Sequence, residues 1–305
     1  MPAKSRKRTR KGKKLYTVIT AIILIIAVLL LLYDKGYFRK KEEVTIPEGS
    51  AQVHFIDVGQ GDCELLISDD GSTMLIDCGE AEYSADVLRY LDGLGIDKLD
   101  YLLISHPHSD HMGGMADIVS SDIAIGTIIM PRVADDYIPT TNVYERFLDA
   151  VADKGYSIHA AKTESVAFGS GELQFLTTDY SGENMNNYSV VVKFTFGENS
   201  FLFSGDAEAE IEKEIVAAGY DISADVYKAG HHGSSTSSSA EWLAAVKPQY
   251  CVVECGAGNI YGHPHEEALK RIGYYADVIL RTDLNGTVVF TSDGRELTYE
   301  ESGQG

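Results

Sequence analysis

Residues 106–111 read His-Pro-His-Ser-Asp-His and are followed by Gly113-Gly114. Three imidazoles and one carboxylate this close together cannot share one face of a regular helix or strand. The stretch directly follows the apolar residues 101–105, so we expect a loop at a strand end that gathers these side chains. Neutral imidazole and carboxylate are ligands for zinc, manganese or iron.

The spacing His-x-His-x-Asp-His predicts two metal ions rather than one. Once residues from elsewhere join, it supplies more ligands than one tetrahedral site needs. Two adjacent metals are an arrangement that activates water and holds the oxygen atoms of a hydrolysed bond. The alternative is a solvated polar loop, but the apolar strand before it and the Gly-Gly pair after it argue for a built site. We expect two divalent ions, zinc or manganese.

Further motifs lie in order along the chain, both before and after residues 106–111. They are Phe55–Asp62, Leu75–Gly79, Asn187–Ser189, Phe203–Asp206, His231–Ser234 and Gly262–His265. With residues 106–111, they resemble the metallo-β-lactamase superfamily and, more narrowly, the extracytoplasmic hydrolase domain of ComEC-type DNA-uptake proteins. The resemblance implies an α/β (α+β) fold, a four-layer αββα metallo-β-lactamase sandwich over residues 52–300. The composition of the N-terminal residues, described below, predicts one transmembrane helix before it.

The resemblance also implies a role for each site residue. His106 and His108 would bind the first metal, Asp110, His111 and His263 the second, and Asp206 would bridge both. The candidate catalytic residues are Asp110 and His231. Two roles stay open for His231: contact with a scissile phosphate or leaving group, or completion of the first metal's ligands. His232 would then be a structural neighbour of His231.

Asn187 departs from the pattern of many superfamily members, which place a third histidine for the first metal at this position. An amide oxygen is a weaker ligand for zinc than imidazole, so the identity of the metal is open. ComEC-type domains typically share this asparagine. Asp57, Asp62 and Asp77 lie in the early motifs and are candidates to hold the outer nitrogens of metal-bound histidines.

The N-terminal residues differ in composition from the rest. Residues 1–14 contain eight Lys or Arg, and residues 15–33 contain no charged residue. Nineteen residues at about 1.5 Å each give about 28 Å, close to the ~30 Å hydrocarbon core. A signal peptide is the alternative, but the apolar run is long and no small-x-small cleavage site follows. We expect a cytoplasmic tail (1–14), a signal anchor (15–33), a linker (34–51) and an extracytoplasmic body.

The body is strongly acidic. Beyond residue 41, the chain holds 14 Lys or Arg against 45 Asp or Glu, a formal charge of −31. Proteins that bind long nucleic acids usually carry a basic surface, and this composition argues against tight binding of long polyanions. It favours a soluble monomer. Cys63 and Cys78 flank a predicted hairpin and could form a disulfide, although two buried thiols fit a body of this size better.

These observations predict a membrane-anchored metal-dependent phosphodiesterase. The resemblance implies DNA as the substrate, and separate channel or competence proteins as partners. The acidic charge keeps a smaller phosphodiester open, such as phosphorylcholine on a cell-wall polymer. A binding or scaffolding domain without catalysis is the alternative of another class, and the retained ligand set argues against it.

Overall fold

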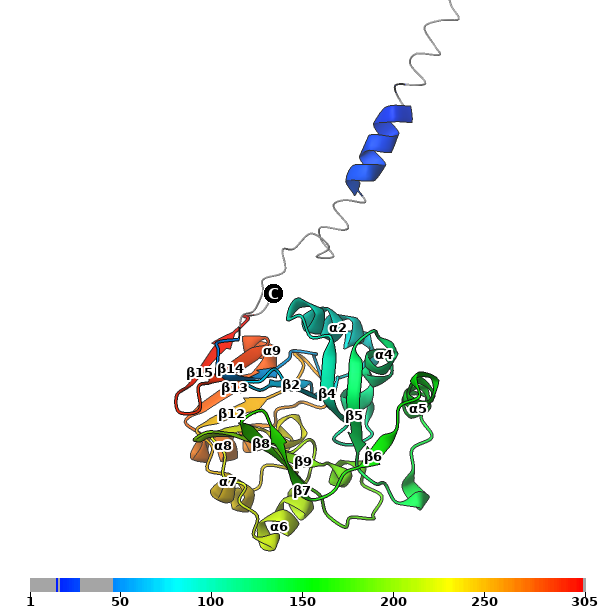
Figure 1. The fold of residues 1–305 in the computed structure, drawn as a ribbon. Coiled ribbons are helices and arrows are strands. Elements are labelled where there is room, and N and C mark those ends of the chain that lie inside the picture. Colours follow the sequence, from blue (N-terminus) through cyan, green and yellow to red (C-terminus); the bar gives the residue numbers. More distant parts are fainter. Residues whose placement is uncertain (1–14, 16, 28–45, 304–305) are drawn as a thin grey trace, which may run out of the picture. The chain divides into compact units, whose positions relative to one another are not determined.

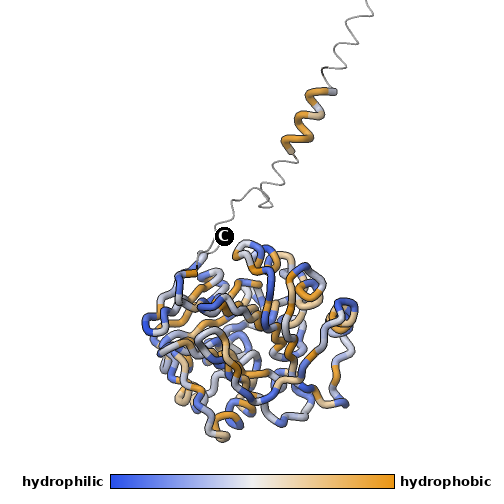
Figure 2. The backbone as a smooth tube through the Cα atoms, viewed as in Figure 1, coloured by the Kyte–Doolittle hydropathy of each residue, from blue (hydrophilic) through white to orange (hydrophobic). Residues whose placement is uncertain are grey.

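The structure, a computed structural model, describes residue 15, residues 17–27 and residues 46–303. Residue 15 and residues 17–27 are helical, and most of them are apolar (Figure 2). In this described part of the chain, no helix has the length and apolarity needed to cross a membrane. The rest of the predicted span 15–33, the tail 1–14 and most of the linker 34–51 lie outside the described residues.

Within residues 46–303, the chain forms two β-sheets, of eight and seven strands (Figure 1). The first has the order β15 (Leu297–Glu301), β14 (Val288–Ser292), β1 (Ala51–Phe55), β2 (Glu64–Ile67), β3 (Thr73–Ile76), β4 (Lys98–Leu103), β5 (Ala124–Met130) and β6 (Ile158–Ala160). The second has the order β13 (Val278–Arg281), β12 (Tyr250–Val253), β11 (Val226–Lys228), β10 (Asn199–Phe203), β9 (Val191–Phe196), β8 (Gly171–Leu176) and β7 (Glu164–Phe168).

Alternate strand residues face opposite sides of a sheet, and this alternation creates three apolar cores. In β2, Leu65 packs with the helices outside the first sheet, whereas Leu66 lies in the core between the sheets. In β10, Leu202 joins the third core, on the outer side of the second sheet, while Phe201 and Phe203 face inward. The two-sheet sandwich with helices on both outer faces confirms the predicted αββα layers.

The helices cover the two outer faces (Figure 1). Those with residues in the first core are α2 (Ser84–Gly93), α4 (Met115–Ser120) and α5 (Asn142–Lys154), and those with residues in the third are α6 (Ala209–Ala218), α7 (Ala240–Val246) and α8 (Glu266–Tyr275). Short helical turns are η1 (Ala81–Tyr83), α3 (Ser109–Met112), η2 (Asp135–Tyr137), η3 (Met185–Tyr188), η4 (Gly230–Gly233) and α9 (Thr282–Asn285).

Local sequence signals place most helix ends. The sequence predicts a helix over 143–154, and α5 begins one residue earlier because the Thr141 hydroxyl accepts a hydrogen bond from the Tyr144 amide. It ends at Gly155, whose φ of 72° is left-handed. The predicted helix over 207–218 begins later, at Ala209, because Glu208 before it is extended. Strands β6, β7 and β15 carry weak strand signals in the sequence, because they are three to five residues long and most of their residues are exposed.

Candidate metal centre

The loops that carry the site leave the carboxyl ends of parallel strands. In the first sheet, β3 pairs with β4 in parallel, and in the second β10, β11 and β12 run parallel. Such ends meet at one edge of a sheet, where open α/β sheets bind ligands. Asp77 follows β3, His106 follows β4, Asp206 follows β10 and His232 follows β11. Segments far apart in sequence therefore meet at one place.

His106, His108 and Asp206 form the first ligand group. His106 Nε2 lies 3.0 Å from His108 Nδ1 and 3.9 Å from Asp206 Oδ2. The other nitrogen of His106 lies 3.1 Å from the Ser105 hydroxyl and 3.3 Å from the Ser189 hydroxyl, which fix the ring. Burial lowers the pKa of His106 well below its usual range, so this imidazole is neutral, the form that binds metal.

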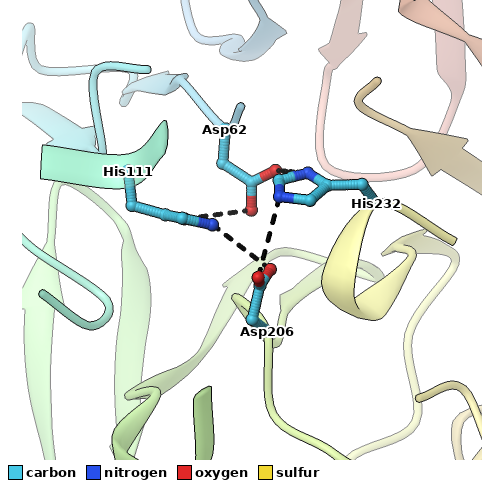
Figure 3. Close-up of side chains that lie close together, drawn as sticks. All are labelled: Asp62, His111, Asp206 and His232. Atoms are coloured by element: carbon cyan, nitrogen blue, oxygen red, sulfur yellow. Dashed lines mark ion pairs between the residues drawn. The ribbon is translucent and has the colours of Figure 1, made fainter. Parts of the chain in front are cut away.

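His111, His232, Asp62 and Asp206 form the second group (Figure 3). His111 Nδ1 lies 2.7 Å from Asp77 Oδ2, and its Nε2 lies 3.3 Å from Asp206 Oδ1. His232 Nδ1 lies 3.0 Å from Asp62 Oδ1, and its Nε2 lies 3.6 Å from Asp206 Oδ2. Each ring has its outer nitrogen beside a carboxylate and its inner nitrogen directed at Asp206, and His232 Nδ1 also lies 3.0 Å from the Glu254 carbonyl oxygen. This is the usual arrangement of metal-bound histidines, and it gives Asp62 and Asp77 the supporting role that the sequence predicts.

The donor atoms between these groups suit a cation. His111 Nε2 and Asp206 Oδ1 are buried and have no hydrogen-bond partner among the described residues. Burial lowers the pKa of His232, but the carboxylates of Asp206 and Asp62 outweigh it and raise that pKa to about 10. The same balance of burial against nearby carboxylates raises the pKa of His111. The site therefore favours positive charge, and a divalent metal ion supplies it without protonating the imidazoles.

Asp110 completes the second group from the helical turn α3. Its Oδ2 lies 3.2 Å from His232 Nε2. Burial alone would raise the pKa of Asp110, but His111 and His232 outweigh burial and lower that pKa below its usual range, so the carboxylate is charged. Gly61 allows α3 to approach, because a Cβ atom there would lie 2.3 Å from the Asp110 carbonyl oxygen.

The structure brings His232, rather than His263, to the second group. His263 lies one ring farther out: its ring centroid is 5.3 Å from that of His231 and 6.2 Å from that of His232. Burial and the neighbouring histidines lower the pKa of His263 to about 4. The sequence analysis favours His231 for the site and interprets His232 as its structural neighbour. Here both have a left-handed backbone, with φ of 52° at His231 and 53° at His232.

His231 lies on the open side of Asp206. Its Nε2 is 3.6 Å from Asp206 Oδ2, and its Nδ1 is 3.3 Å from the Thr236 hydroxyl and 3.6 Å from Glu208 Oε1. The ring is half-buried and lines the cavity over the ligand groups. This position suits either of the two roles that the sequence leaves open.

Asn187 does not face the metal centre, which corrects the sequence-based alignment of this segment. Its side chain donates to Glu210 Oε2 at 3.1 Å and accepts from the Glu208 amide at 3.2 Å. The turn η3 presents the preceding residue instead: Asn186 Nδ2 lies 3.4 Å from His231 Nδ1, and Asn186 Oδ1 is buried with no hydrogen-bond partner among the described residues.

A buried ionic cluster that sequence reasoning missed supports the second group. Lys228 contacts Asp62, and both side chains are completely buried. Burial, together with neighbouring carboxylates, raises the pKa of Glu254 to about 8 and that of Glu64 well above its usual range. The carboxylates of Asp62, Glu64 and Glu254 lie close enough to hold an ion, but the Lys228 ammonium already lies against them. The sequence feature that could have indicated this cluster is Lys228, a charged residue at the end of the apolar strand β11.

Two cavities lie on either side of η3. The one over the ligand groups has a volume of about 260 Å³ and is lined by Gln60, His108, Ser109, Asp110, Asn186, Asp206, His231, His232, Tyr261 and His263. The other has a volume of about 500 Å³, and its lining includes Arg132, Asp135, Asp179, Tyr180, Asn187 and Tyr188. The four cysteines are buried free thiols, so Cys63 and Cys78 form no disulfide.

Comparisons with known proteins agree with this architecture. Residues 56–253 match the family model of the metallo-beta-lactamase superfamily. The chain is 29% identical over 268 residues to ComE operon protein 3 of Bacillus subtilis, covering 81% of this chain and 34% of that protein. It is 29% identical over 284 residues to competence protein ComA of Neisseria gonorrhoeae, covering 88% of this chain and 38% of that protein.

The chain thus spans about a third of the length of these curated relatives. Among solved structures, the CmlA beta-hydroxylase E377D mutant superposes with a TM-score of 0.50 at 15% identity, over 78% of this chain and 53% of that chain, and supports the fold alone. The chain belongs to the metallo-β-lactamase superfamily, and its homologues include ComEC-type competence proteins.

Proposed function

We propose that this protein is a phosphodiesterase that cuts DNA with two divalent metal ions. The observation that carries the proposal is the carboxylate of Asp206, which belongs to both ligand groups. Its Oδ2 lies 3.9 Å from His106 Nε2 and 3.6 Å from His232 Nε2, and its Oδ1 lies 3.3 Å from His111 Nε2. A carboxylate shared by two groups of imidazoles suits a two-metal hydrolase. Zinc and manganese both accept these ligands.

The residues have distinct tasks. His106 and His108 would hold the first ion, His111, His232 and Asp110 would hold the second, and Asp206 would contribute to both. The bound ions would supply a hydroxide at neutral pH and positive charge for the phosphate oxygens. Asp110 is charged and faces the cavity, so it accepts a hydrogen bond from the attacking water and orients it. Asp77 and Asp62 keep the rings of His111 and His232 in place.

His231 acts on the leaving group. Its ring lies at the cavity wall beside Asp206, and Glu208, Asn186 and Thr236 lie around its Nδ1. These contacts leave Nε2 directed at the reacting region. A histidine in this position donates a proton to the departing oxygen, which contributes about 10²–10⁴-fold in rate.

The substrate assignment rests on the competence relatives. A smaller phosphodiester, such as phosphorylcholine on a cell-wall polymer, is the second candidate. It is favoured by the lining of the metal cavity, in which none of the described residues is Lys or Arg. A long polyanion would normally engage such groups.

We further propose that residues 15–33 anchor the protein in the cell membrane, with residues 1–14 in the cytoplasm and the catalytic body outside as a monomer. The eight basic residues before the apolar run, against four shortly after it, support this orientation. We propose separate channel or competence proteins as its partners in DNA transport. Protease added to intact protoplasts should remove the body, whereas full protection of the body would overturn this topology.

One panel tests the catalytic proposal. The full chain, purified in detergent and loaded with Mn²⁺ or Zn²⁺, is offered a bis-aryl phosphate, single-stranded DNA, an aryl phosphorylcholine and a β-lactam. We expect about two ions per chain and cleavage of the bis-aryl phosphate and the DNA. Asp206→Asn should abolish cleavage of both substrates. Cleavage confined to the phosphorylcholine ester would assign the second candidate. Absence of bound metal, or cleavage of the β-lactam alone, would overturn the proposal.

A further inference from the structure

The loop between β12 and α8 exposes two large apolar side chains beside the metal cavity. Ile260 is 92% exposed, the highest value among the exposed large hydrophobic residues in the described part of the chain, and Tyr261 is 58% exposed. Tyr261 also lines the cavity over the ligand groups, together with Asp110 and Asp206. Exposed apolar residues at the mouth of a site commonly mark a binding surface.

Asn259 holds this loop in one shape. Its Nδ2 donates to the Gly256 carbonyl at 2.9 Å and to the His263 carbonyl at 2.5 Å. Its Oδ1 accepts from the Tyr261 amide at 3.1 Å and the His263 amide at 3.0 Å. One side chain therefore ties the loop together on both sides of Tyr261, so the tyrosine is presented on a prearranged backbone.

The tyrosine ring continues a row of aromatic rings that leads to the ligand groups. Tyr261 stacks on His263, with ring centroids 5.7 Å apart and an interplanar angle of 23°. His263 in turn lies edge-on to His231, at 5.3 Å and 76°. His231 lies next to Asp206. Because one face of the tyrosine ring is against His263, the exposed part of the ring can accept another flat group from solvent.

The charge of the site points to the chemistry of that group. Among the described residues that line the cavity, none is Lys or Arg, and the chain beyond residue 41 has a formal charge of −31. Lys and Arg side chains therefore supply little affinity for the phosphate backbone at this cavity. Stacking of bases on aromatic side chains needs no positive charge, and every base has a face that can stack.

We propose that Ile260 and Tyr261 form a stacking site that binds a nucleobase of a single-stranded nucleic acid next to the scissile phosphate. The site rests on the proposed phosphodiesterase function and explains how so acidic a protein could hold this substrate. The base stacks on Tyr261, and Ile260 covers its edge. Affinity at this site depends on the base and little on salt.

The test compares two oligomers of equal length and charge, oligothymidylate and the same deoxyribose-phosphate chain without bases. Binding to the full chain in detergent is measured by fluorescence anisotropy with a chelator present to stop cleavage, and KM and kcat are measured with Mn²⁺. We expect Tyr261→Ala to weaken binding of oligothymidylate about tenfold, the change that stacking of one base supports. It should raise KM rather than lower kcat and leave the abasic oligomer unaffected.

Matched variants complete the design. Tyr261→Phe should behave like the wild type, because the ring is retained. Tyr274→Ala removes a tyrosine that is 83% exposed on α8 and does not line the cavity, and it should change neither oligomer. Equal weakening of both oligomers by Tyr261→Ala, or no change in either, would overturn the stacking site. Base-dependent binding without any cleavage in the presence of Mn²⁺ would instead support the stacking site and overturn the phosphodiesterase.

Discussion

Lys228 directs its ammonium at the carboxylate of Asp62, and both side chains are completely buried. Asp62 also lies 3.0 Å from His232 Nδ1. The lysine therefore supports the metal centre indirectly: it holds the carboxylate that holds the ligand. Burial opposes the charge on Asp62, but Lys228 and the two nearby histidines lower its pKa, so the pair is ionic.

Replacement of Lys228 should be strongly destabilising. Lys228→Met keeps most of the side-chain volume but leaves Asp62 without its buried partner, beside Glu64 and Glu254. Removing one member of a buried ion pair costs about 3–5 kcal/mol in the free energy of unfolding. Urea denaturation of the full chain measures this change. Lys193→Met is the control, since Lys193 pairs with an Asp221 that is 77% exposed and should lose about 1 kcal/mol or less.

The stability of the metal-free protein should fall as pH rises. The pKa of His232 is about 10 in the folded protein against 6.5 ordinarily, so the folded state binds the extra proton between these values. The stabilising contribution is complete below pH 6.5 and is lost as pH rises through about 10. The pKa of Glu254 is raised from 4.5 to about 8, so its contribution to stability is likewise lost as pH rises from 4.5 to 8.

Urea denaturation at pH 6.5 and pH 9.5 in the presence of a chelator checks this expectation. His232→Gln should reduce the slope with pH, and His159→Gln, on an exposed residue of β6, should keep it. Bound metal should also reduce the slope, because the ion replaces the protons. Equal slopes in wild type and His232→Gln would show that another group carries the effect.

Substitution by histidine should have different effects on metal release at the adjacent residues Asn186 and Asn187. Asn186→His places an imidazole on the cavity wall near His231, and we expect slower loss of metal to a chelator. Asn187→His should not slow that loss, because Asn187 faces Glu210 and the Glu208 amide. Metal release followed by a chromophoric chelator distinguishes them. Slower release from the 187 variant alone would restore the sequence-based alignment.

Removal of the His231 ring should lower turnover while metal remains bound. If His231 protonates the leaving group, His231→Ala lowers kcat by about 10²–10⁴-fold. A substrate with a good leaving group, such as a bis-aryl phosphate, should be affected less than DNA. His265→Ala, outside the residues that line the cavity, is the control. Loss of one metal equivalent from His231→Ala, measured by elemental analysis, would make His231 a metal ligand instead.

Much of the fold could be predicted because the signals are local. Apolar runs of strand length, the Asp70-Gly71 turn and glycine at helix ends place most strands and helices. Strand β15 could not be predicted, because its five residues include only two apolar side chains, Leu297 and Tyr299, and its pairing with β14 is a tertiary contact. Helix α6 begins later than its composition suggests, since residues 206–208 belong to the site loop.

The superfamily, the sandwich and the candidate ligands His106, His108, Asp110, His111 and Asp206 could be predicted from the sequence, because these residues lie in short motifs at strand ends. Which later histidine joins Asp62, His111 and Asp206 depends on the tertiary structure. His231, His232 and His263 all lie in loops at the same edge, and sequence spacing does not distinguish their directions. The contacts of His232 Nδ1 with Asp62 and the Glu254 carbonyl turn that ring inward, while Asn259 keeps His263 and Tyr261 at the rim.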